Sequence, residues 1–199
     1  DVFVSMLDSV FSVPPVFDDS YYGFPIHEIR EMTVMNMGNY AHGNQPIQHM
    51  IYLYNYAGQP WKAQYWLREV MNRMYKNHIR GLSGNDDCGQ MSAWYLFTAM
   101  GFYPVCPGTD QYVLGAPYLP YLKMSLPNGK TFEIKAPGVS DKKRYVKSVR
   151  LNGKPYTKMY ITHKDITEGG VMEFVMSASP NKSRGQTKAD KPYSLTEGK

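Results

Sequence analysis

Hydrophobic residues recur at helical spacing through the first half of the chain. This pattern predicts helices over residues 2–11, 27–37, 46–57, 60–77 and 89–100. Pro46 and Pro60 suit a first helical turn, and Gly58 and Gly101 suit a helix end. The last of these helices is apolar on nearly every side, so we expect it to be buried.

After about residue 104 the pattern changes to short strand-like segments. They lie at 112–115, 122–126, 131–136, 145–151, 156–161 and 171–176. Turn signals separate them, at Pro127-Asn128-Gly129, Asn152-Gly153 and Glu168-Gly169-Gly170. The sequence therefore predicts an α+β chain with helices over 1–103, an antiparallel β-sheet or sandwich over 104–180 and a flexible polar tail over 181–199.

Charge is distributed unevenly between the two halves. Residues 1–103 hold 6 Lys/Arg and 9 Asp/Glu, whereas residues 104–199 hold 16 Lys/Arg and 8 Asp/Glu. Most basic residues of the second half stand singly among strand-like segments, the run at 142–144 excepted. This spacing favours a solvated sheet surface, and we expect no nucleic-acid partner. No apolar run is long enough to span a membrane, so we expect no membrane span.

The candidate chemistry lies in the segment Gly84–Tyr95. Here Asp86 and Asp87 stand on a glycine-flanked loop directly before the apolar helix. Paired carboxylates suit acid/base hydrolysis, but one of them could equally cap the helix that follows. From the residues alone the cap is favoured. Cys88 and Cys106 are too few for a metal site and could form one disulfide or remain free thiols.

Several blocks carry a resemblance to a known family. They are Tyr40–Pro46 (YAHGNQP), Tyr52–Lys62 (YLYNYAGQPWK) and Gly81–Pro104, followed by Leu151–Lys154, Ile161–His163 and Ser179–Lys182. In this order they resemble glycoside hydrolase family 92, the calcium-dependent, exo-acting α-mannosidases of bacteria. The resemblance implies inverting hydrolysis of terminal α-mannosides in glycan degradation, with an α-1,2 linkage expected. It also implies a periplasmic, extracellular or cell-surface location.

The resemblance implies a particular place for this chain in a longer protein. Family members have an N-terminal β-sandwich before an (α/α)6 barrel, and this chain resembles only the last barrel helices and the β-region behind them. The partners implied are a mannose-containing glycan and the missing N-terminal part of the same polypeptide. The family's general acid is a Glu that precedes the first helix of this chain, so we expect the isolated chain to be inactive.

The resemblance also assigns roles to the loop residues. Asp87 matches the general base, while Asp86 and Asn85 lie where the family holds polar residues around the attacking water. Asn44 and Gln45 match residues that bind Ca²⁺, which prefers oxygen ligands. Other members have Glu at the position of Gln45, and a neutral amide binds the ion less strongly. Without the resemblance, Gly-Asn-Gln-Pro is explained by a turn and a helix start.

Three further residues are candidates for sugar binding: His42, Gln48 and Trp61. For His42 a structural role is the alternative, and Trp61 could belong to the core. Two other functions stay open for the chain. One is a non-catalytic carbohydrate-binding or structural module, and the other is a different (α/α)6 glycosidase or phosphorylase, which phosphate dependence of glycan cleavage would distinguish.

Overall fold

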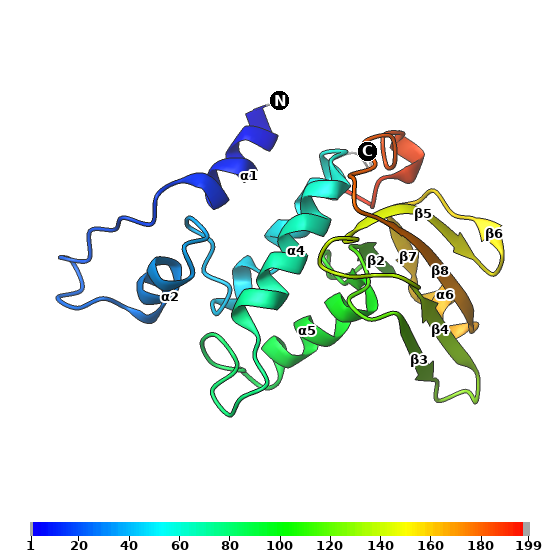
Figure 1. The fold of residues 1–199 in the computed structure, drawn as a ribbon, viewed down its shortest axis with the longest axis horizontal. Helices are drawn as coiled ribbons and strands as arrows, with labels where there is room; N and C mark the ends of the chain where they lie inside the picture. The colour runs from blue at the N-terminus through cyan, green and yellow to red at the C-terminus, as the bar shows by residue number, and fades with distance from the viewer. Residues whose placement is uncertain (1, 197–199) are drawn as a thin grey trace. The chain divides into compact units, whose positions relative to one another are not determined.

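The computed structural model describes residues 2–196 of the 199-residue chain (Figure 1). The chain divides into two compact units. The first unit comprises Asp1–Met50 and Glu69–Tyr95, and the second comprises Ile51–Arg68 and Leu96–Lys199. The helices α4 (Pro60–Met74) and α5 (Gln90–Met100) each contribute residues to both units.

The first unit is helical, as the hydrophobic spacing predicts. It contains α1 (Val2–Ser12) and α2 (His27–Met35), both within or close to the predicted ranges. Val4, Leu7 and Phe11 form the buried side of α1, since residues three and four apart lie on one helix face. α2 ends at Asn36, whose φ of 50° is the left-handed conformation common at helix ends.

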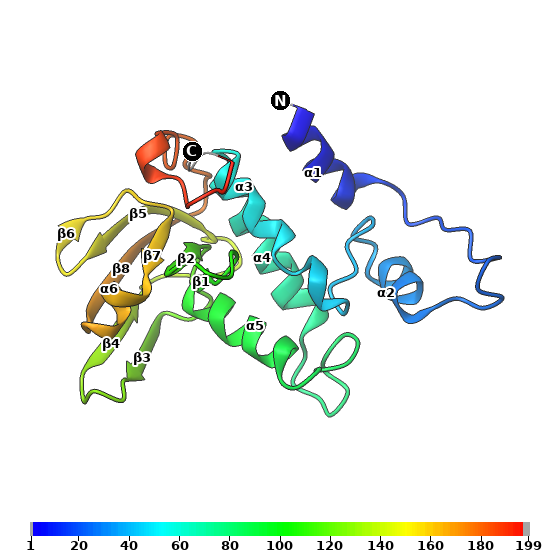
Figure 2. The ribbon, with the colours of Figure 1, turned by 180° about the vertical axis from the view of Figure 1, so that it is seen from behind.

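The predicted helix over 46–57 is wrong in one respect, because the structure breaks it. It becomes the 3-10 turns η1 (Gln45–Ile47) and η2 (Met50–Tyr52), followed by the short α3 (Leu53–Tyr56), which Figure 2 labels. Within this stretch the Gln48 carbonyl oxygen accepts a hydrogen bond from Trp94 Nε1 at 3.3 Å, a contact that the spacing does not predict.

The helix α5 also differs from its prediction. Trp94 is fully buried, as expected for a helix with apolar residues on most sides. Leu96, however, is 62% exposed, and Ser92 is exposed in the first turn. Among the described residues, α5 is therefore not buried on every side.

Two sheets make up most of the second unit. A three-stranded sheet has the order β1 (Phe102–Tyr103), β2 (Gln111–Leu114), β7 (Tyr160–Thr162). A five-stranded sheet has the order β3 (Tyr121–Ser125), β4 (Thr131–Lys135), β8 (Gly170–Ser177), β5 (Tyr145–Leu151), β6 (Lys154–Pro155). The predicted α+β class is confirmed, and the predicted strands match except that 156–161 shortens to β7.

One strand pair departs from the antiparallel prediction. β4 and β8 run parallel, with Phe132 opposite Gly170, while the other pairs are antiparallel. The chain reaches β8 through α6 (His163–Thr167), which the sequence reading missed. A capping box at its start joins Thr162 and Asp165, so the signal was present. β8 then lies between β4 and β5, parallel to the first and antiparallel to the second.

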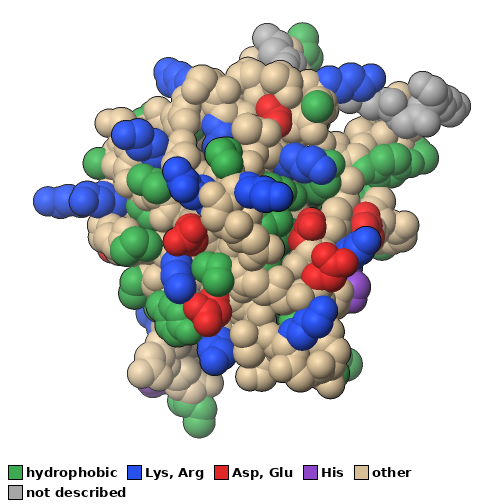
Figure 3. Space-filling view, turned by 90° about the vertical axis from the view of Figure 1, so that its right-hand side faces the viewer, with side chains coloured by type: hydrophobic (Ala, Val, Ile, Leu, Met, Phe, Trp, Pro, Cys, Tyr) green, Lys and Arg blue, Asp and Glu red, His purple; other side chains and the backbone are tan. Residues whose placement is uncertain are grey.

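The core of the second unit is drawn from both sheets and includes Phe102, Leu114, Phe132, Ile134, Val149, Ile161, Met172 and Phe174. Figure 3 shows the side with the strands, where Lys and Arg side chains stand among acidic and hydrophobic ones without merging into one basic patch. This distribution agrees with the solvated sheet surface predicted from the scattered lysines.

Described residues after Pro180 make hydrogen bonds to the β-region, and the flexible tail over 181–199 stays a prediction. Arg184 donates from Nη1 to the carbonyl of Tyr156 at 2.8 Å and from Nη2 to that of Lys158 at 3.0 Å. Tyr193 donates its backbone N–H to Gln111 at 2.8 Å. The Arg184 side chain and the Tyr193 backbone thus both pair with groups of the β-region. The proposed domain boundary near residue 103 stays a prediction.

The two cysteines do not form the disulfide that their number would permit. Cys88 and Cys106 are both free thiols. Of the helices within residues 2–196, none has the length and apolar content needed to cross a membrane.

Candidate functional site

Two loops of the first unit meet at a backbone contact. Gly43 in the turn before η1 and Gly84 in the loop before α5 approach so closely that a Cβ on Gly84 would lie 2.7 Å from the Gly43 carbonyl oxygen. Gln45 Nε2 also donates to the carbonyl of Asn85 at 2.8 Å, across 40 positions of sequence. The structure therefore brings the residues predicted for calcium beside those predicted for catalysis.

Asp86 acts as a cap at the start of α5. Its Oδ1 accepts the backbone N–H of Ser92 at 2.9 Å, and its Oδ2 accepts the Ser92 hydroxyl at 3.1 Å. An N–H in the first turn of a helix has no partner within the helix, so this carboxylate satisfies it. The capping alternative raised by the sequence thus describes Asp86.

Asp87 has a different environment. Its side chain is exposed, and its carboxylate has no hydrogen-bond partner among residues 2–196. Asp87, Cys88 and Gly89 have consecutive positive φ angles of 41°, 59° and 93°. Non-glycine residues adopt this left-handed region at a cost, and such strain gathers at functional loops. Asp87 is therefore the exposed carboxylate of the pair, whereas Asp86 is bonded to Ser92.

His42 lies in a buried chain of hydrogen bonds. Its Nδ1 is 2.9 Å from the Tyr40 hydroxyl and its Nε2 is 2.7 Å from the Tyr75 hydroxyl, which donates to the Met91 carbonyl at 3.1 Å. Because Tyr75 donates to Met91, it accepts from His42, and this assigns the proton to Nε2. Burial lowers the pKa of His42 to about 3, so the ring is neutral.

The other proposed sugar contacts also have structural surroundings. Gln48 is buried and donates from Nε2 to the His42 carbonyl at 3.3 Å, while its Oε1 accepts from Gln90 at 3.1 Å. His42 and Gln48 thus support the turn that carries Asn44, and their contact with a sugar stays a prediction. Trp61 lies half-buried in the first turn of α4 and belongs to the second compact unit.

Glu31 on α2 contacts the turn before Asn44, a contact that the sequence pattern does not predict. Its Oε1 and Oε2 lie 2.9 and 3.1 Å from the backbone nitrogen of Gly43, which donates to them. Burial raises the pKa of this carboxyl, while hydrogen bonds from the backbone of Gly43 and His42 oppose the rise. An isolated Glu on an amphipathic helix reads as solvent-exposed, and only the fold shows the loop that it contacts.

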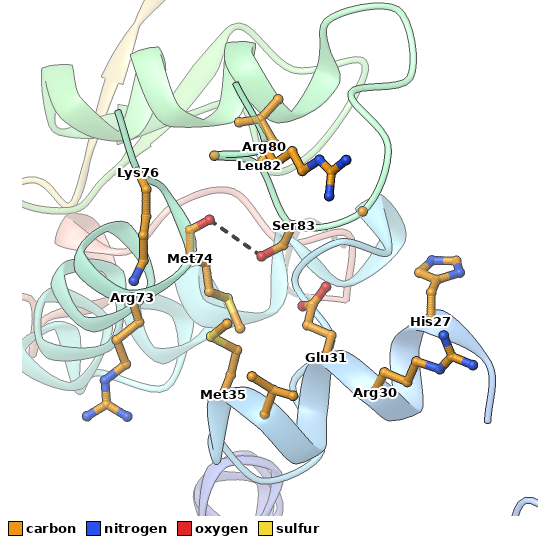
Figure 4. Close-up of a pocket in the computed structure, with 13 residues that line it drawn as sticks. His27, Arg30, Glu31, Met35, Arg73, Met74, Lys76, Arg80, Leu82 and Ser83 are labelled. Carbon is orange, nitrogen blue, oxygen red and sulfur yellow. Dashed lines mark hydrogen bonds between the residues drawn. The ribbon is translucent and has the colours of Figure 1, made fainter. Parts of the chain in front are cut away.

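Glu31 also lines a pocket of about 330 Å³ beside Gly84 (Figure 4). Arg30, Lys76 and Arg80 stand around it, and none makes an ion pair among the described residues. Figure 4 shows Ser83 directed at the Met74 carbonyl, to which its hydroxyl donates at 3.4 Å. The pocket therefore presents three basic side chains around the single carboxylate of Glu31.

The oxygen atoms near Asn44 and Gln45 fit a calcium ion in kind. Gln45 uses its amide nitrogen to bind Asn85, so its Oε1 has no hydrogen-bond partner among residues 2–196. Asn44 is exposed, so its amide oxygen is open to an ion as well. Calcium takes six to eight oxygens, including amide and carboxylate groups. Within the described residues there is no cluster of three or more His, Cys, Asp or Glu that could hold a metal by themselves.

Comparison with known proteins gives agreeing matches. The model of the glycosyl hydrolase family 92 catalytic domain matches residues 1–178. The family GH92 α-mannosidase BT3965 of Bacteroides thetaiotaomicron is 42% identical with a TM-score of 0.86. The Family GH92 inverting mannosidase BT2199 of the same species is 47% identical with a TM-score of 0.82. An uncharacterised secreted glycosidase of Arthroderma benhamiae is 30% identical over 159 residues.

The chain spans only part of these relatives. It is covered to 98% by each of the two bacterial structures but accounts for 24% and 26% of their lengths. For the fungal protein the matched share is 78% of this chain and 20% of the relative.

Proposed function

The chain belongs to glycosyl hydrolase family 92, and on this premise we propose that it is the C-terminal part of an exo-acting α-mannosidase. Its substrate is a glycan with terminal mannose, with the α-1,2 linkage as the first to test. The solved relatives described as mannosidases, one of them as inverting, support the substrate class and the stereochemistry. In this proposal the helices belong to an (α/α)6 barrel.

The proposal rests mainly on the different surroundings of the Asp86 and Asp87 carboxylates, where the loop before α5 meets the turn before η1. Asp86 is occupied by Ser92, whereas Asp87 is exposed and unpaired among the described residues. An ionised carboxylate of this kind can accept a proton from water as the water attacks the sugar. Asp87 is therefore the general base.

Inversion requires a second carboxyl group that protonates the leaving oxygen. In inverting glycosidases the two groups lie roughly 6.5–9.5 Å apart, which leaves room for the water. In our proposal a glutamate in the remaining part of the polypeptide serves as this acid. The 199 residues by themselves then have a base without its acid and do not turn over substrate.

Calcium is the proposed cofactor. Asn44 and Gln45 would hold it through their amide oxygens, and the bound ion would grip the 2- and 3-hydroxyls of mannose. The Gln45–Asn85 hydrogen bond fixes the distance between this turn and the base loop, so that the sugar and the water are presented together. A periplasmic or extracellular location completes the proposal, and the relative described as secreted supports it.

The test uses the full-length protein and the 199-residue chain in parallel. The full-length protein should release mannose from α-1,2-mannobiose, lose activity with a chelator and regain it with calcium. Proton NMR in the first minutes should show β-mannose, the inverted anomer. Release of mannose 1-phosphate that depends on phosphate would assign a phosphorylase instead, and activity of the short chain alone would remove the need for a second carboxyl outside it.

A further inference from the structure

Asn44 and Gln45 present a problem for calcium binding, because both side chains are neutral. Cation sites of high affinity draw on carboxylate charge, and amide oxygens supply only dipoles. The neighbouring loop offers Asp86 and Asp87, of which Asp86 is already occupied by Ser92. A source of negative charge behind the Asn44–Gln45 turn would resolve the problem.

Glu31 is in position to be that source. Both of its carboxylate oxygens face the Gly43 N–H, the peptide directly before Asn44. Charge-assisted bonds of this type are stronger than neutral ones and fix the direction of the peptide. A Cβ on Gly43 would lie against Glu31 Oε2 and 3.0 Å from the Gly84 nitrogen, so the carboxylate, the turn and the base loop meet at one point.

The charge of Glu31 is not cancelled by a direct partner. Among the described residues it makes no ion pair, and its neighbour Glu28 is paired with His27 at 3.2 Å. The basic residues Arg30, Lys76 and Arg80 line the same pocket, yet none is bonded to the carboxylate. Partial burial reduces the screening of Glu31 by water, so its field reaches a cation at the turn.

We propose that Glu31 is a positioning residue that orients the Gly43–Gln45 turn and supplies the negative charge that the two amide ligands lack. This inference rests on the proposed function, since it concerns the calcium of that site. Glu31 does not touch the ion or the sugar. It acts through the Gly43 peptide, as outer partners of metal ligands commonly do.

The experiment compares Glu31→Gln with Glu28→Gln in the full-length protein. Both variants remove one carboxylate from α2, but only Glu31 contacts the turn. Calcium alone is titrated by calorimetry into each chelator-treated protein. We expect Glu31→Gln to weaken calcium binding by about 10- to 100-fold, the usual effect of removing an outer partner. Glu28→Gln should bind calcium as the wild type does.

Two further measurements separate positioning from mere stability. The melting temperature of Glu31→Gln without calcium should match that of the wild type, and its kcat should recover at saturating calcium. Equal calcium affinity in Glu31→Gln and the wild type would overturn the inference, and so would a loss that excess calcium does not restore. If the wild type binds no calcium, calcium is not the cofactor and the proposed function is contradicted on that point. The titration of the wild type shows this before any variant is made.

Discussion

Ser92 holds the carboxylate of Asp86 through two hydrogen bonds, one from its backbone nitrogen at 2.9 Å and one from its hydroxyl at 3.1 Å. The next residue, Asp87, turns into a left-handed conformation with φ of 41° and leaves the helix start. Two adjacent carboxylates thus have different surroundings. One stabilises α5, and the other remains free for chemistry.

Replacing Asp87 by Asn should remove turnover in the full-length protein without altering its stability. Asn has nearly the same shape and tolerates a left-handed backbone, so only the charge and the basicity are lost. A general base contributes about 10²- to 10⁴-fold, and we expect kcat on an α-mannoside to fall by that range. Steady-state kinetics and thermal melting measure both effects. Near-normal kcat would show that Asp87 is not the base.

Replacing Asp86 by Ala should mainly affect stability. The variant leaves the Ser92 N–H without its partner, and loss of a cap of this kind costs about 0.5–2 kcal/mol. Denaturant unfolding of the full-length protein measures the change. Ser92→Ala removes only the 3.1 Å hydroxyl bond and should give a smaller loss. If Asp86→Ala instead abolishes turnover at unchanged stability, Asp86 has a catalytic role as well.

The sequence was a good guide where local pattern decides the structure. Hydrophobic spacing placed α1, α4 and β5 within a few residues, and the Asn152-Gly153 turn follows β5 as predicted, although the short β6 after it was not predicted. It was a poor guide where distant groups decide. The helix predicted over 46–57 is broken, and within it the Gln48 carbonyl bonds to Trp94, a partner 46 positions away.

The candidate site divides in the same way. Motif order predicted roles for Asp87 and Asn44, and these stay predictions, but spacing could not tell that His42 is enclosed by two tyrosine hydroxyls. The sequence gives no sign of the contact between Glu31 and Gly43, because the two residues are 12 positions apart and belong to different elements. Spacing along the sequence does not identify polar residues that contact a loop from another element, and only the fold shows them.

Replacing Gly84 by Ala should separate the two loops. A Cβ there would lie 2.7 Å from the Gly43 carbonyl oxygen, which is closer than atoms can approach, and Gly84 also has a φ of +67°. Gly89→Ala is the control, since its φ is +93° but nothing lies within 4 Å of a Cβ. Both variants therefore bear the left-handed strain, and only Gly84→Ala adds the clash.

We expect Gly84→Ala to be less stable than Gly89→Ala by about 1–3 kcal/mol, the usual cost of overpacking. It should also bind calcium more weakly, because the Gln45–Asn85 bond depends on the same contact. Equal stability and equal calcium affinity in the two variants would mean that the loops do not rely on the Gly43–Gly84 approach.

Replacing Tyr75 by Phe should destabilise the protein through His42. The change keeps the ring but removes the hydroxyl that accepts from His42 Nε2 at 2.7 Å and donates to the Met91 carbonyl. His42 is fully buried, so its N–H would be left without a partner, at a cost of about 1–3 kcal/mol. Tyr21→Phe, at a side chain that is 91% exposed, is the control and should change little. Denaturant unfolding of both full-length variants makes the comparison, and equal stability would mean that water replaces the lost hydroxyl beside His42.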